Sequence, residues 1–181
     1  MRVITGTAKG IVLNTPDGLQ TRPTSDRVKE ALFSAIQFDV PGATVLDLFA
    51  GTGQLGIEAL SRGANKAVFV DLTDSACKLV KKNLVKTKLD QKAIVVKSDY
   101  LEYLRRTKEK FSIIFLDPPY AEVFLENSLK MITEIDILQS GGIIVAERPS
   151  GKELSMDFSG YSRSRDYKYG NSLICIYRKE I

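Results

Sequence analysis

The sequence predicts a doubly wound α/β fold: a mainly parallel, seven-stranded sheet that ends in an antiparallel hairpin. Short apolar runs alternate with amphipathic stretches from Thr44 onward, the order expected when strands and helices build a parallel sheet. The runs are nearly continuous in Val, Ile and Leu, as in strands that are covered on both faces. After Pro149 the alternation stops, and two extended runs meet at Gly170-Asn171, a pair typical of a hairpin turn.

The first half of this alternation holds three strands and two helices. Residues 44–49 and 66–70 are rich in β-branched and aromatic side chains, and each is predicted to be a strand. Residues 55–62 form a helix between them. Residues 75–86 follow with apolar side chains on one helical face, and Thr73 or Asp74 can serve as the N-cap. Residues 93–96 are the third strand.

The second half supplies the remaining elements. Asp99 is expected to cap a short helix that runs to Arg106 and buries Tyr100, Tyr103 and Leu104. Residues 111–116 form the fourth strand and residues 123–137 a further helix. Gly141-Gly142 leads into a fifth strand at 143–147. The final two strands are predicted at 161–169 and 172–178.

The first forty residues do not follow the alternation. Residues 1–5 and 10–13 suggest a small hairpin, residues 21–23 an extended piece, and Thr24 or Ser25 can cap a helix that runs to about residue 38. We therefore divide the chain into an N-terminal extension, 1–40, and a main domain, 41–181.

Composition excludes several classes of protein. The chain has 181 residues, 44% hydrophobic and 27% charged, which favours one ordinary globular domain. We find no apolar stretch of membrane-spanning length and no signal core, so we expect a cytoplasmic protein. We also expect a monomer that holds no metal. Histidine is absent, which removes His-based catalysis and the usual zinc sites. Cys77 and Cys175 are expected to be buried apolar groups.

The net charge of +4 is unevenly distributed. Seven lysines and a single acid, Asp90, lie between Lys78 and Lys97. Such a run can be a solvated helix face or a surface that contacts nucleic-acid phosphates, and the sequence leaves both interpretations open.

Asp117-Pro118-Pro119-Tyr120 directly follows the fourth predicted strand. Because the two prolines lack N–H groups and fix φ, the chain can continue neither as a central strand nor directly as a helix. The resulting stiff loop presents a carboxylate, free carbonyls and an aromatic ring. These groups can hold a planar amino group, with acceptors for its N–H donors and a ring for stacking.

A glycine-rich loop lies between the first strand and its helix. Gly51, Gly53 and Gly56 have the spacing G-x-G-x-x-G, and Asp71 ends the second strand, where it can accept hydrogen bonds from ribose hydroxyls. Asp47 beside this loop would repel a pyrophosphate but suits a cationic amino acid moiety, such as that of S-adenosylmethionine. Asp99 can meet an adenine amino group or act only as a helix cap.

These motifs together resemble the class I S-adenosylmethionine-dependent amino-methyltransferases, which have a Rossmann-like fold. The run from Arg22 to Phe33 (RPTSDRVKEALF), with Tyr169-Gly170, is similar to the RsmD family of bacterial 16S rRNA (guanine-N2)-methyltransferases. The resemblance implies RNA contacts by residues 1–40, among them Lys9, Arg22 and Arg27, although the two arginines could equally serve the helix start. It implies a catalytic loop of Asp117, Pro118, Pro119 and Tyr120. It implies cofactor contacts by Asp47, Phe49, Ala50, Gly51, Thr52, Gly53, Asp71, Leu72, Asp99 and Tyr100.

The expected activity is therefore methyl transfer from S-adenosyl-L-methionine to a guanine amine of 16S rRNA within the small ribosomal subunit. Three alternatives have different requirements. A DNA adenine or cytosine amino-methyltransferase usually carries a large target-recognition region. A nicotinamide-dependent oxidoreductase has a sheet that stays parallel, without a C-terminal antiparallel hairpin. A non-catalytic binding module would not need the loop at Asp117.

Overall fold

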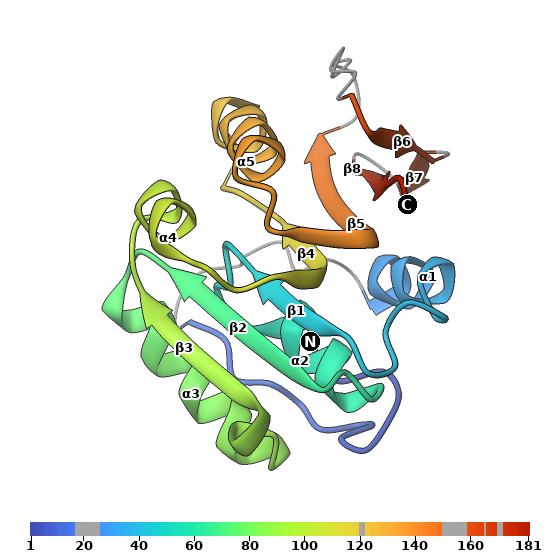
Figure 1. The fold of residues 1–181 in the computed structure, drawn as a ribbon. Helices are drawn as coiled ribbons and strands as arrows, with labels where there is room; N and C mark the ends of the chain where they lie inside the picture. The colour runs from blue at the N-terminus through green and yellow to red at the C-terminus, as the bar shows by residue number, and fades with distance from the viewer. Residues whose placement is uncertain (17–25, 120–121, 150–158, 165, 170–171) are drawn as a thin grey trace.

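The computed structural model describes residues 1–16, 26–119, 122–149, 159–164, 166–169 and 172–181. Within these ranges the chain folds as an α/β sandwich around one sheet (Figure 1). Arg22, Tyr120 and the expected turn at Gly170-Asn171 lie outside the described residues. No helix in the described ranges is long and apolar enough to cross a membrane.

The sheet confirms the predicted topology. Its order is β3-β2-β1-β4-β5-β8-β6, and β7 also pairs with β8. The pairs among β1 to β5 are parallel, whereas β8 is antiparallel to β5. β6 pairs with one end of β8 and β7 with the other, so the eight strands occupy seven positions. The strands are β1 (Thr44–Asp47), β2 (Lys66–Asp71), β3 (Ala93–Lys97), β4 (Phe111–Leu116), β5 (Leu138–Pro149), β6 (Tyr161–Arg163), β7 (Tyr167–Tyr169) and β8 (Ser172–Lys179).

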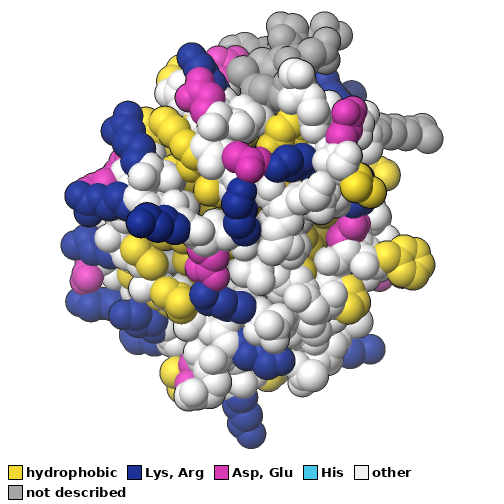
Figure 2. All heavy atoms as spheres, in the orientation of Figure 1, with side chains coloured by type: hydrophobic (Ala, Val, Ile, Leu, Met, Phe, Trp, Pro, Cys, Tyr) yellow, Lys and Arg dark blue, Asp and Glu magenta, His cyan; other side chains and the backbone are white. Residues whose placement is uncertain are grey.

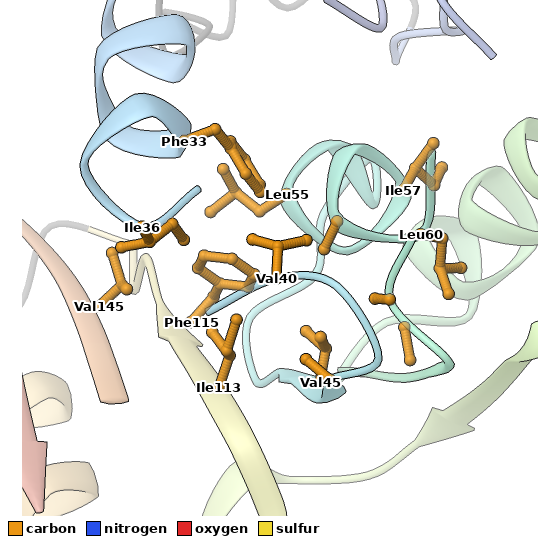
Figure 3. Packing of buried hydrophobic residues seen from close by; sticks show 14 of the residues in the cluster. Phe33, Ile36, Val40, Val45, Leu55, Ile57, Leu60, Ile113, Phe115 and Val145 are labelled. Carbon is orange, nitrogen blue, oxygen red and sulfur yellow. The ribbon is translucent and has the colours of Figure 1, made fainter. Parts of the chain in front are cut away.

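Helices cover both faces of the sheet, as a doubly wound fold requires. α1 (Asp26–Ala35), α2 (Gln54–Ser61) and α3 (Asp74–Thr87) lie on one face, and α4 (Tyr100–Arg106) and α5 (Glu122–Ile135) on the other (Figure 1). Alternate side chains of each strand enter one of two cores. Figure 3 shows the first core, in which Phe33 of α1 and Ile36, directly after that helix, approach Phe115 of β4 and Val145 of β5.

Several boundaries differ from the expected ones for local reasons. β5 begins five residues early, and its pairing with β4 shifts register where Gly141 adopts a φ of +72°, as in a β-bulge. α5 ends at Ile135 because Asp136 takes a left-handed φ of +55°. The single run expected at 161–169 is divided into β6 and β7.

The N-terminal hairpin is present as a single antiparallel bridge between Arg2 and Val12. The Val3 N–H donates to the Ile11 carbonyl at 3.0 Å, and the Gly10 N–H donates to the Val3 carbonyl at 2.8 Å. The segment is fixed to α2 by Glu58, a fully buried acid that accepts from the backbone N–H groups of Ile4 and Thr5 at 2.8 and 3.0 Å. The N-terminal hairpin is thus bound to the helix that follows the glycine-rich loop.

Buried Lys29 joins α1 to the same acid. Its Nζ lies 3.7 Å from Glu58, and both side chains are inaccessible to solvent. Burial lowers the pKa of Lys29, while the Glu58 carboxylate opposes that shift. A buried pair of this kind stabilises only while both partners are present, because one charge left alone in the interior is strongly unfavourable.

Candidate active site

The candidate site lies where the chain direction across the sheet reverses. From β1 the chain proceeds outward to β2 and β3, and then returns to β4 on the other side of β1. Ligands of open α/β sheets bind at the carboxyl ends of strands at such a reversal. The glycine-rich loop follows β1 and the Asp117 loop follows β4, so the two predicted motifs are neighbours at one edge of the sheet.

The glycine-rich loop has the backbone conformation that its glycines permit. Gly51 and Gly53 have φ values of +53° and +79°, in the left-handed region that favours glycine. The Ala50 N–H donates to the Val70 carbonyl, and the Gly53 N–H to the Ala50 carbonyl. A Cβ added to Gly51 would meet no atom within 4 Å of the described structure, so this side of the loop is open to an approaching molecule.

Gly56 is needed for the packing of α2 against the sheet. A Cβ there would lie 2.3 Å from the Phe69 ring of β2, so α2 can approach the sheet closely only because this residue lacks a side chain. The three glycines of the motif therefore have two distinct functions, which the spacing alone does not separate.

Asp71 holds this loop from the neighbouring strand. Its Oδ2 accepts from the Gly51 N–H at 3.0 Å, and its Oδ1 accepts from the N–H and hydroxyl of Thr73, also at 3.0 Å. Thr73 in turn caps α3 by accepting from the Ala76 N–H. The acid predicted to meet ribose hydroxyls is thus fixed beside the loop.

Asp47 is more deeply buried than the sequence indicates, with an exposed fraction of 2%. Its Oδ2 accepts from the Gly56 N–H at 3.0 Å, one of the N–H groups that the first turn of a helix leaves unpaired. Burial raises the pKa of Asp47 to about 7, the Gly56 hydrogen bond opposes the rise, and the negative charge of Asp71 adds to it.

Three aromatic rings gather beside the loop. Phe49 lies 5.2 Å from Tyr100 and 6.4 Å from Phe124, and Tyr100 lies 5.5 Å from Phe124, measured between ring centroids. They come from the end of β1, the start of α4 and the start of α5. Asp99 precedes this group and caps α4, with its Oδ1 accepting from the N–H groups of Leu101 and Glu102. The cap is confirmed, and Oδ2 makes no hydrogen bond to a described residue.

Asp117 is the acid of the second loop. It is half-buried, as is Pro118, while Pro119 is exposed. Its carboxylate accepts no hydrogen bond from any described residue, unlike those of Asp47 and Asp71. Burial raises its pKa to about 7, and the negative charges of Glu147 and Asp47 add to the rise.

Asp47, Asp117 and Glu147 belong to one face of three adjacent strands. Val45, Ile113 and Val145 point into the core beneath α1 and α2, and the three acids follow them at even spacings along β1, β4 and β5. Because strand side chains alternate between faces, the acids project to that same side. This position explains why the negative charges of Glu147 and Asp47 raise the pKa of Asp117.

Comparison with known proteins identifies the family of this chain. The model of the family described as Conserved hypothetical protein 95 matches residues 1–178. The chain belongs to this family. It is 42% identical to the putative rRNA methyltransferase YlbH of Bacillus subtilis, with 99% of both proteins covered. It is 32% identical to ribosomal RNA small subunit methyltransferase D of Escherichia coli, covering 99% of this chain and 90% of that protein.

A solved structure agrees with these matches. The putative methyltransferase yhhF of Escherichia coli superimposes with a TM-score of 0.90 at 33% identity, covering 99% of this chain and 98% of that one. The resemblance to the RsmD family drawn from the motifs is therefore confirmed.

The predicted residues of this family member fall into two groups. The structure brings together the loop at 47–53, Asp71, Asp99, Tyr100 and the loop at 117–119. Leu72 is 65% exposed beyond Asp71, and Lys9 and Arg27 are exposed on the N-terminal extension, where neither forms an ion pair with a described residue. Their assignment to ligand or RNA contacts stays a prediction.

Sequence reasoning missed three residues near the site. Glu147 is an acid near the carboxyl end of β5, as Asp47 is an acid at the end of β1, and that repeated pattern could have identified it. Phe124 could have been found from its position just after the Asp117 loop. Asn83 carries no local signal: its side chain accepts from the Asn14 N–H at 2.7 Å and donates to the carbonyls of Asn14 and Thr52 at 3.1 and 2.9 Å, contacts that only the fold creates.

Proposed function

We propose that this chain methylates the exocyclic N2 amine of a guanine in 16S ribosomal RNA, with S-adenosyl-L-methionine as the methyl donor. The observation that carries the proposal is the adjacency of two loops, one after β1 and one after β4. The first is open to a ligand at Gly51, and the second presents an acid that accepts no hydrogen bond from a described residue. Both occur in a member of a family whose relatives are named rRNA methyltransferases.

The residues at the first loop fit the donor molecule. Gly51 leaves room on its open side. Gln54, which follows the loop, has a buried side-chain oxygen that accepts no hydrogen bond from the described residues. Asp71 and the free Oδ2 of Asp99 would accept hydrogen bonds from the ribose and adenine groups, and Phe49 and Tyr100 would contact the adenine ring. When bound, S-adenosylmethionine supplies a methyl group activated by the positive charge of its sulfonium.

Asp117 and Pro118 would hold the acceptor. An exocyclic guanine amine is a poor nucleophile because its lone pair is delocalised into the ring. Two hydrogen bonds, donated by the amine to the Asp117 carboxylate and the Pro118 carbonyl, favour a pyramidal nitrogen and direct its lone pair toward the methyl donor. The target base must leave its stack to reach this loop, and Tyr120 would stack on it there.

The same carboxylate can take the proton that the reaction releases. Once the nitrogen has gained a fourth substituent it carries a positive charge and becomes strongly acidic. Asp117, with a pKa of about 7, is a base of suitable strength near neutral pH. Catalysis then consists of positioning and electrostatic stabilisation without a covalent intermediate.

Neither cysteine is placed for nucleophilic attack. Cys77 and Cys175 are 6% and 0% exposed, and burial raises the pKa of both thiols. Reactive cysteines need a lowered pKa and access to the substrate. Cytosine-C5 chemistry, which depends on a thiolate, is accordingly disfavoured.

The choice of ribosomal RNA over DNA rests on the relatives, which are named rRNA methyltransferases. We assign recognition of that RNA to residues 1–40, including Lys9, Arg22 and Arg27.

Product analysis tests this function. The protein is incubated with isotopically labelled S-adenosylmethionine and with small subunits from cells that lack the family member, and 16S rRNA is digested to nucleosides for mass spectrometry. We expect label only in N2-methylguanosine. Label in methyladenosine or methylcytidine would contradict the assigned acceptor. In a parallel incubation with DNA in place of subunits, transfer to DNA alone would favour the DNA-modifying alternative.

A further inference from the structure

A dense group of lysines lies on one flank of the molecule, outside the two loops of the candidate site. It consists of side chains on α3, in the turn after it and at both ends of β3, all exposed to solvent. Figure 2 shows Lys and Arg side chains gathered along the edge where Figure 1 places α3 and β3. We call this group the lysine surface; it comprises Lys78, Lys81, Lys82, Lys86, Lys88, Lys92 and Lys97.

The segment that carries the lysine surface has a larger net positive charge than the whole chain. Residues 75–98 contain seven lysines and one acid and therefore carry +6, whereas the complete chain carries +4. All other residues together sum to −2. The basic character of the protein thus resides in a single segment of 24 residues rather than being spread over the surface.

In the described part of the structure, six of these seven lysines also lack the ion-pair partners that basic residues elsewhere have. Lys78 pairs with Asp74 at 2.7 Å, but the other six form no ion pair with a described residue. Elsewhere Lys66 pairs with Glu109, and Arg178 with Asp39. Like charges at one-turn spacing on a helix repel one another, so the lysine surface does not stabilise the free protein.

The lysine surface begins at the edge of the sheet that carries the candidate site. Lys97 lies beside Asp71 in the β2–β3 register, and Lys92 stands at the opposite end of β3. α3 has 14 residues and a rise of about 1.5 Å per residue, so it extends about 21 Å in the same direction. A ligand on this flank would run from the site down the side of the molecule.

The composition of the lysine surface favours nucleic acid over protein as its partner. Protein interfaces are enriched in Arg and aromatic residues and depleted in Lys, yet residues 75–98 contain no Arg and no aromatic residue. Lysine acts as a flexible point charge that suits phosphates. Val85 and Ile94, 65% and 45% exposed between the lysines, add small apolar contacts suited to sugar rather than a large docking surface.

We propose that the lysine surface binds the phosphate backbone of the substrate RNA outside the segment that enters the active site. This inference rests on the proposed function and extends it, because it names a second RNA contact, on α3 and β3, outside residues 1–40. Its energy should be mainly electrostatic and independent of base sequence, since each neutralised phosphate releases counterions.

The test compares two triple variants of equal charge. Lys82→Gln, Lys86→Gln and Lys92→Gln remove three cations of the lysine surface, whereas Lys108→Gln, Lys130→Gln and Lys168→Gln remove three exposed cations elsewhere. Binding of each protein to small subunits and to protein-free 16S rRNA is measured over a range of salt concentrations. Thermal unfolding and binding of S-adenosylhomocysteine verify that fold and donor site are intact.

We expect the first variant to bind both RNA forms about 10-fold more weakly at low salt, with the slope of log K against log salt reduced by about 2 to 3. The control should keep the wild-type slope. Equal slopes for the two variants would overturn the proposal. Weaker binding to subunits but unchanged binding to protein-free rRNA would assign the surface to a ribosomal protein instead. If the wild type itself methylated neither RNA form, the proposed function would fail, whatever the slopes.

Discussion

Asp117 differs from the acids around it because no described residue donates a hydrogen bond to its carboxylate. Asp47 is bound to the Gly56 N–H, and Asp71 to Gly51 and Thr73. A half-buried carboxylate that accepts no hydrogen bond from the described residues has lone pairs available to accept one from a ligand. It is also difficult to ionise. The same environment therefore provides the acceptor atoms and limits the pH at which they can act.

Activity should accordingly depend on pH near neutrality. Burial, then the charges of Glu147 and Asp47, raise the pKa of Asp117 to about 7. Only the ionised form can take the proton that methyl transfer releases, so the rate is expected to fall as pH drops through 7. At pH 6 single-turnover methyl transfer should retain about a tenth of its plateau rate.

Glu147→Gln tests the cause of this pH dependence. The substitution keeps the shape of the side chain but removes one of the charges that raise the pKa of Asp117, so the acid limb of the pH–rate profile should move to lower pH. Glu126→Gln, at an exposed position of α5, is the control of equal charge change. An acid limb that stays in place in the Glu147 variant would show that Asp117 ionisation does not control the rate.

At the scale of elements, the loop after β1 and the helix α2 need glycine for different reasons. Gly51→Ala places a methyl group in open space at a φ of +53°, which costs about 1 kcal/mol. Gly56→Ala forces a methyl group to within 2.3 Å of the Phe69 ring, an overpacking that costs about 1–3 kcal/mol and that better helix propensity offsets in part.

The two variants should therefore separate binding from stability. We expect Gly51→Ala to weaken S-adenosylhomocysteine binding at least 10-fold in calorimetry with a small change in Tm. Gly56→Ala should lower Tm by several degrees and affect binding less. The reverse pattern would mean that the open side of Gly51 does not face the donor.

Asn83 connects the N-terminal segment to the donor loop across α3. It is fully buried, and its three hydrogen bonds reach Asn14 and Thr52. Asn83→Ala leaves these backbone groups unpaired, and each buried unpaired group costs about 1–3 kcal/mol. We expect lower stability in urea unfolding together with weaker S-adenosylhomocysteine binding. Asn65→Ala, at an exposed position, should change neither; an effect of Asn83→Ala on stability alone would exclude the coupling.

At the scale of the whole molecule, the mainly parallel sheet, its antiparallel end and most element boundaries follow from the sequence. Hydrophobic runs and caps act locally, so Thr73 and Asp99 begin their helices as predicted. The bulge at Gly141 and the division of 161–169 depend on pairing with distant strands. For the same reason Asn83 escaped notice: its importance arises from neighbours more than 25 residues away.

The central claim is that the loop at Asp117 positions the acceptor amine beside the donor site. The most direct measurement compares Asp117→Ala with the wild type in two assays, S-adenosylhomocysteine binding by calorimetry and single-turnover methyl transfer to small subunits. Binding should stay within about twofold, because Asp117 belongs to the neighbouring loop, while transfer should fall by at least about 10²-fold. Retained transfer with intact binding would contradict the claim.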